Sequence, residues 1–201
     1  MNMNKILTVI LFPIVLSVGI VLIPVVPDYS NHSLAAQAVG QTGRWVAGHL
    51  LAAVAFGLSM WSTSVIAVEC ERLGSKVPVF IMLLLSAGGG LYAAGLGADG
   101  IGPTAVKATG ASPLIFFEGS GWWVTGVFMT ATLFFGVGLI LLVVYAIRGR
   151  VVVGVWRYIV FISALIFVSA PAIPSGWALY GVAFASLGVF LPIGLSIRRA
   201  D

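Results

Sequence analysis

The sequence predicts an all-α membrane protein, a bundle of six transmembrane helices. Of its 201 residues, 60% are hydrophobic and only 8% are charged, whereas soluble domains carry roughly 25% charged residues. Six apolar stretches are long enough to cross a hydrocarbon core of roughly 30 Å, which takes a helix of about 20 residues. These stretches are continuously apolar, which favours helices over the alternating strands of a barrel. The composition excludes a soluble domain, a disordered chain and a nucleic-acid-binding module.

The predicted spans follow one another through a single domain, 1–201. They cover residues 6–26, 45–68, 77–96, 122–147, 151–172 and 175–197. The first contains Pro13 and ends at two further prolines, and we expect it to be a retained span and not a cleaved signal peptide. The second is closed by Glu69 and two neighbouring charged residues. The third has Pro78 in its first turn, where the missing N–H costs nothing.

The last three spans are joined by tight turns. The fourth is long and uninterrupted, and Arg148-Gly149-Arg150 connects it to the fifth. Two prolines and a glycine at 171–176 form the turn between the fifth and the sixth. The long connections are 27–44 and 98–121, both expected as outer loops. A loop as long as 98–121 is unusual in a compact protein and is often functional.

The lysines and arginines predict the orientation of the bundle, because they gather in cytoplasmic loops. With the N-terminus in the cytoplasm, only Arg44 and Lys107 lie on the outer side. The others all lie inside: Lys5, Arg72, Lys76, Arg148, Arg150, Arg157, Arg198 and Arg199. We therefore expect both termini in the cytoplasm, and a prokaryotic cytoplasmic membrane as the location. The net charge of +4 is then an orientation signal and not a surface for nucleic acid.

Small residues in the third span predict close helix packing. The span contains Gly88-Gly89-Gly90, and Gly89 with Ala93 and Gly90 with Ala94 stand at i, i+4 spacing, an arrangement that lets membrane helices approach closely. We expect this stripe to pack inside one bundle and not to form a dedicated dimer face.

Four polar residues form a candidate functional cluster on the outer side: Arg44, His49, Asp99 and Glu118. The simpler interpretation is a set of solvated charges near helix ends, with Glu118 favoured at a helix N-terminus and able to pair with Arg44. The alternative is a polar cap over the mouth of the bundle. Every acidic residue lies in a predicted loop or at a span end, which argues against the usual buried carboxylate of a proton-coupled transporter.

His49 is the one polar side chain placed inside a span that suggests chemistry. It lies about 6 Å below Trp45 at the helical rise. It could bond a carbonyl or a loop group near the surface. It could also serve as a haem ligand, a quinone partner or a proton acceptor. No catalytic motif or metal-ligand cluster stands in the sequence, so no cofactor is predicted, and haem b or quinone at His49 remains the alternative.

Two short stretches, GRWVAGHLL at 43–51 and GADG at 97–100, carry a loose resemblance. They resemble features of uncharacterised prokaryotic six-span integral membrane proteins of similar length. The resemblance implies a six-helix bundle and brings no activity with it.

Three functions follow as hypotheses. Apolar helix faces and the lack of catalytic motifs favour a non-catalytic accessory subunit of a larger membrane complex, with the lipid bilayer and other membrane subunits as partners. The two groups of three spans and the outer polar cluster favour a small transporter or a lipid-binding protein. A second alternative is a membrane redox protein that uses His49 with haem or quinone. Nucleic acid is not an expected partner.

Overall fold

The computed structural model describes the backbone of residues 3–199 and the side chains of residues 3–119 and 123–197. All regular structure in these residues is helical, which confirms the all-α class. The elements are α1 (Met3–Leu22), α2 (His32–Ala38), α3 (Thr42–Arg72), α4 (Val79–Ala108), α5 (Leu114–Arg148), α6 (Trp156–Ser169), the short 3-10 helix η1 (Ala170–Ala172) and α7 (Gly176–Arg199).

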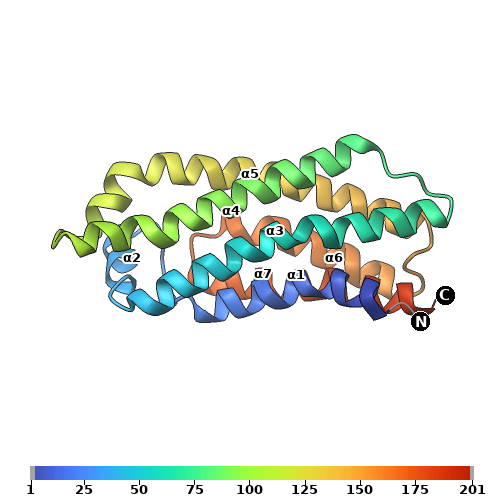
Figure 1. The fold of residues 1–201 in the computed structure, drawn as a ribbon, viewed down its shortest axis with the longest axis horizontal. Coiled ribbons are helices and arrows are strands. Elements are labelled where there is room, and N and C mark those ends of the chain that lie inside the picture. The colour runs from blue at the N-terminus through green and yellow to red at the C-terminus, as the bar shows by residue number, and fades with distance from the viewer. Residues whose placement is uncertain (1–2, 200–201) are drawn as a thin grey trace.

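Six of these helices form a closed ring. Each of α1, α3, α4, α5, α6 and α7 packs against the next in chain order, and α7 packs against α1. Consecutive helices run in opposite directions, so α1 begins and α7 ends at the same end of the bundle (Figure 1). We name this the N/C end. The short helix α2 lies at the opposite end, the α2 end, where it packs against α5.

An aromatic layer fills the interior of the ring, with one side chain from each of the six helices. Its members are all buried: Phe12, Phe56, Tyr92, Phe135, Phe167 and Phe190. The ring centroid of Phe12 lies 5.0 Å from that of Phe190 and 5.6 Å from that of Phe56. Phe56 in turn stacks on Tyr92 at 4.2 Å. Such ring pairs add to the energy of simple burial, so the layer joins all six helices.

Five helices are long and apolar enough to cross a membrane, and a sixth is apolar but shorter. The five segments are Met3–Leu22, Thr42–Arg72, Val79–Ala108, Trp123–Arg148 and Gly176–Ile197, and the shorter one is Trp156–Ala172. The structure thus supports a membrane protein, while the sixth crossing and the cytoplasmic position of the termini stay predictions.

The predicted start of the fifth span, 151–172, lies before the start of the helix in the structure. The helix starts only at Trp156, because Arg150 and Gly154 adopt positive φ angles of 57° and 64°. Left-handed backbone cannot continue an α-helix, so residues 151–155 run as an irregular segment before α6.

The expectation of a long loop at 98–121 is wrong. α4 continues to Ala108 and α5 begins at Leu114, which leaves only residues 109–113 between them. Glycines and Pro103 predicted a break, but Pro103 is buried and Gly102 lies against the ring of Phe116. Tertiary packing therefore overrides the weak local propensity. The resulting α4/α5 hairpin extends beyond the other helices at the α2 end (Figure 1).

The predicted loop 27–44 is also partly helical. It contains all of α2 and the first residues of α3. The side chain of Asn31 accepts a hydrogen bond from the backbone N–H of Ser33 and so caps α2, as short polar residues commonly do at helix starts.

The expected packing inside the bundle holds for Gly88 and Gly89 of α4 and not for Gly90. A Cβ added at Gly88 would overlap the backbone of Phe135 on α5, and one at Gly89 would lie 3.2 Å from the Ser59 hydroxyl on α3. Gly90 faces open space. Two neighbouring glycines thus set the approach of α4 to both of its neighbours, while the third takes no part.

Candidate functional site

The centre of the candidate site is an ion-pair contact between α3 and α4 near the α2 end. His49 Nε2 lies 3.3 Å from Asp99 Oδ2. The His49 side chain is only 3% exposed and that of Asp99 15%. The other ring nitrogen, Nδ1, lies 2.7 Å from the backbone carbonyl oxygen of Trp45, one turn earlier on the same helix. A carbonyl oxygen only accepts, so Nδ1 carries a hydrogen and donates it.

Trp45 covers this pair. Its indole is fully buried and lies over the imidazole of His49, with 4.4 Å between ring centroids. The indole N–H donates to the backbone carbonyl of Asp99 at 2.8 Å, a second polar tie between α3 and α4. The helices approach this closely because residue 100 is glycine: a Cβ there would lie 2.7 Å from His49 Cβ.

Tyr29, in the connection between α1 and α2, is near enough to Asp99 to feel its charge. Its backbone N–H donates to the Pro174 carbonyl at 2.8 Å, which ties this connection to the turn before α7. Burial raises the pKa of the Tyr29 phenol, and the negative charge of Asp99 raises it further. The phenol therefore stays protonated and uncharged at neutral pH.

The turn that carries Tyr29 is fixed by Asp28. The Asp28 carboxylate accepts hydrogen bonds from the backbone N–H and the hydroxyl of Ser30, at 2.8 and 2.6 Å. These two bonds hold the pKa of Asp28 below its usual range, because they stabilise the ionised form. Asp28 is a turn residue in the structure and is not part of the His49 contact.

The structure brings together two of the four predicted cluster residues and separates the other two. Arg44 Nε and Nη2 donate to the carbonyls of Leu22 and Val21, at 3.2 and 3.4 Å. These are among the last carbonyls of α1, a favourable place for a cation. Glu118 is exposed, and no ion pair joins it to Arg44 within the described part of the chain.

Lys107 plays the same role for another helix. Its ammonium donates to the carbonyls of Val39 and Gly40, just after the end of α2, and to the hydroxyl of Thr42. The two cations predicted on the outer side therefore cap helix ends instead of forming an open polar cap.

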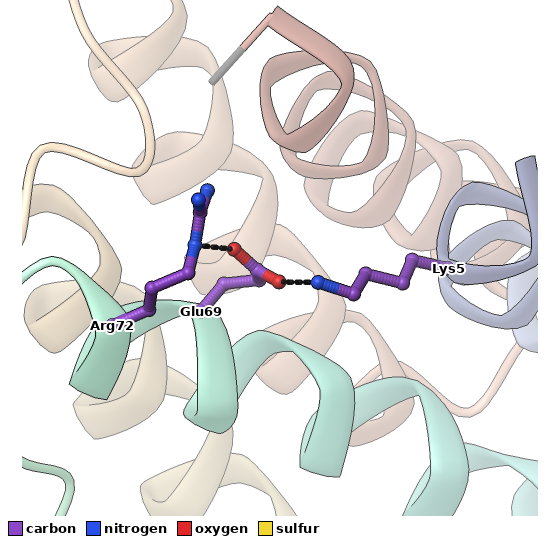
Figure 2. Close-up of polar contacts among 3 residues, drawn as sticks. All are labelled: Lys5, Glu69 and Arg72. Atoms are coloured by element: carbon purple, nitrogen blue, oxygen red, sulfur yellow. Dashed lines mark hydrogen bonds and ion pairs between the residues drawn. The ribbon is translucent and has the colours of Figure 1, made fainter. Parts of the chain in front are cut away.

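Sequence reasoning missed a buried ion triad at the N/C end. The Glu69 carboxylate is 1% exposed and lies between two cations (Figure 2). Lys5 Nζ reaches one oxygen at 2.5 Å, and Arg72 Nε reaches the other at 2.8 Å. The i, i+3 spacing of Glu69 and Arg72 was a visible signal, but Lys5 comes from α1 and only the fold places it there. The triad ties α1 to α3.

The contacts of His49 limit what it can bind. Both ring nitrogens are engaged, one by a carbonyl and one facing Asp99. A haem iron would have to take Nε2 and displace the Asp99 carboxylate. Among the described residues, no group of three histidine, cysteine or acidic side chains is arranged to hold a metal ion.

Comparison of this chain with known proteins finds no matching family, no matching curated protein and no matching solved structure. The resemblance to prokaryotic six-span proteins therefore stays a prediction, and function has to be argued from the geometry of the chain itself.

Proposed function

We propose that this chain is a non-catalytic subunit of a larger membrane complex and that it packs on its partner through the α5/α6 side of the ring. The observation that carries the proposal is the length of α6. Its 14 residues and the three of η1 that continue it rise only about 27 Å, less than the roughly 30 Å of a hydrocarbon core. A span that is too short is accommodated by a thinner bilayer or by association with other protein.

The segment before α6 favours association. Residues 151–155 have irregular backbone, and Val153 and Val155 are exposed there. Irregular backbone at membrane depth is tolerated where protein covers it and not where it faces lipid. A partner lying against this corner would provide that cover.

The outer surface of α6 offers apolar side chains for such a contact. Those exposed are Tyr158, Ile159, Phe161, Ile162, Leu165 and Ile166. The seam between α5 and α6 is also the least extensive in the ring. Its close approach rests on Gly136, where a Cβ would lie 2.7 Å from a methyl carbon of Val168. A helix held weakly by its own chain gains most from a neighbour in another chain.

The aromatic layer supports a scaffold over a transporter. A substrate crossing the centre of the helix bundle would have to push apart the six packed aromatic side chains of this layer. Lipid binding has one specific observation in its favour. An apolar groove of about 340 Å³ opens on the outer surface between α1 and α3, lined by Leu7, Thr8, Ile10, Leu11, Ile14, Leu58 and Trp61. This groove is the basis of the second candidate function, retention of a bound lipid chain.

Site-specific photocrosslinking in native membranes tests the subunit proposal. A photoreactive amino acid replaces Ile162 on α6 or, as the matched control, the equally apolar and exposed Leu83 on α4. We expect Ile162 to capture one discrete protein chain in stoichiometric yield and Leu83 to capture lipid only. Lipid adducts alone at both positions, with a lone 21.0 kDa chain after mild extraction, would contradict the proposal. Native mass spectrometry of the same preparation reports any retained lipid.

A further inference from the structure

The hydrogen-bond pattern around His49 leaves one proton to be assigned. Because Nδ1 already donates to the Trp45 carbonyl, a neutral His49 would carry no hydrogen on Nε2. The bare Nε2 would then face Asp99 Oδ2 at 3.3 Å. If Asp99 were ionised, two electron-rich atoms would oppose each other in a largely buried site, which is unfavourable without a hydrogen between them.

We propose that His49 and Asp99 together form a proton-binding site that ties α3 to α4 near the α2 end. The pair takes one proton from the adjoining aqueous phase, which leaves either an imidazolium facing a carboxylate or a neutral imidazole facing a carboxylic acid. No other bond forms or breaks. Asp99 is the more exposed partner, so it is the point at which the proton enters and leaves.

The surroundings of the pair favour the bound proton. The centroid of the Trp45 indole lies 4.4 Å from that of the imidazole, within the range in which an aromatic ring attracts a cation. The site is also sterically built, since Gly100 lets α4 approach the His49 side chain directly. The phenol of Tyr29, which feels the charge of Asp99, is a neutral group and does not compensate a bare carboxylate.

The other charged groups near this end are engaged elsewhere or exposed. Arg44 donates to carbonyls at the end of α1, and Lys107 donates to carbonyls after α2. Glu118 on α5 is exposed to solvent. Within the described residues, Asp99 is therefore the only charged side chain in ion-pair contact with His49.

Nuclear magnetic resonance can locate the proton directly. The chain has two histidines, so the exposed His32 is replaced by Gln and ¹⁵N-labelled histidine then reports His49 alone, while ¹³C-labelled aspartate reports Asp99. At about pH 6, near ordinary histidine titration, we expect two protonated ring nitrogens with an ionised Asp99, or one with a protonated Asp99. Either result places the proton on the pair. A single protonated nitrogen opposite an ionised Asp99 would overturn the proposal.

Asp99→Asn is the matched variant, because its amide N–H can donate to a bare Nε2 and keep the contact without an added proton. We expect His49 in this variant to carry hydrogen on Nδ1 only. Hydrogen on both ring nitrogens of His49 in Asp99→Asn at the same pH would count against the site, and the nitrogen spectra of wild type decide it even if the variant does not fold.

Discussion

At the N/C end, the Glu69 carboxylate is held by two cations that are much more exposed than it is. The side chains of Lys5 and Arg72 are 30% and 40% exposed, against 1% for Glu69. Each cation can turn to water if it loses its partner, because long basic side chains extend toward the polar interface. The buried carboxylate has no such alternative. The triad is therefore asymmetric, and the anion depends on the cations more than they depend on it.

This asymmetry predicts the outcome of breaking the triad. We expect the double variant Lys5→Met/Arg72→Met to lower the free energy of unfolding by about 3 kcal/mol, since it strands a buried charge. Glu69→Gln should cost only about 1 kcal/mol, because a neutral amide can still bond to Lys5 or Arg72. Denaturant titration in mixed micelles measures both, with the exposed Glu71→Gln as the control. A larger loss for Glu69→Gln than for the double variant would refute the asymmetry.

At the scale of elements, α4 packs closely against a neighbouring helix on each of two sides. Gly88 lies against the backbone of α5, Gly89 against α3, and Gly100 against His49 of α3. These glycines stand where a side chain would separate helices, whereas Gly90 has nothing within 4 Å. Membrane helices lack a hydrophobic force between them and depend on close packing, so the packed positions should tolerate no added atoms.

The neighbouring glycines of α4 allow a paired test. We expect Gly88→Ala to lower the free energy of unfolding by about 1–3 kcal/mol, because its Cβ would overlap the Phe135 backbone and push α5 away. Gly90→Ala should raise stability by about 0.5–1 kcal/mol through helix propensity alone. Thermal unfolding in detergent compares the two variants under identical conditions. Equal shifts at both positions would show that the α4–α5 approach is not set by Gly88.

For the whole molecule, the interior of the six-helix ring is filled by the aromatic layer, to which each helix contributes one buried side chain. Phe12 on α1 has ring contacts to Phe56, Phe135, Phe167 and Phe190, and Phe135 on α5 likewise contacts four rings of this aromatic layer. The ring closes only when α7 reaches α1, so the first and last helices meet through the Phe12–Phe190 pair. The layer thus links local helix formation to closure of the bundle.

Truncation of Phe12 tests whether the aromatic layer stabilises closure of the bundle. We expect Phe12→Ala to lower the free energy of unfolding by about 3–5 kcal/mol, since it removes a buried ring and leaves a cavity that its neighbours cannot fill. Phe184→Ala removes an exposed ring from α7 and should change stability by no more than about 0.5 kcal/mol. Unfolding titrations of the two variants provide the measurement. Equal losses would mean that the layer does not stabilise closure.

The functional site was only half visible in the sequence. His49 and Asp99 were both candidates, and His49 does bond a carbonyl, but nothing in the local pattern paired the two. Their contact depends on the register of α3 against α4, which Gly100 and the Trp45–Asp99 hydrogen bond set. Arg44 and Glu118 were grouped with them by location alone. In the structure, Arg44 instead donates a hydrogen bond to a carbonyl at the end of α1.

What the sequence by itself determined was the class of protein: an all-helical chain of long apolar segments, with its charges at the ends. Hydropathy and charge position are local properties, so these features need no knowledge of neighbours. Only the tertiary structure decided that residues 98–121 are mostly helical, that α6 begins at Trp156, and that Glu69 is buried. Each of these depends on contacts between residues far apart in the chain, which outweigh weak local preferences once helices pack.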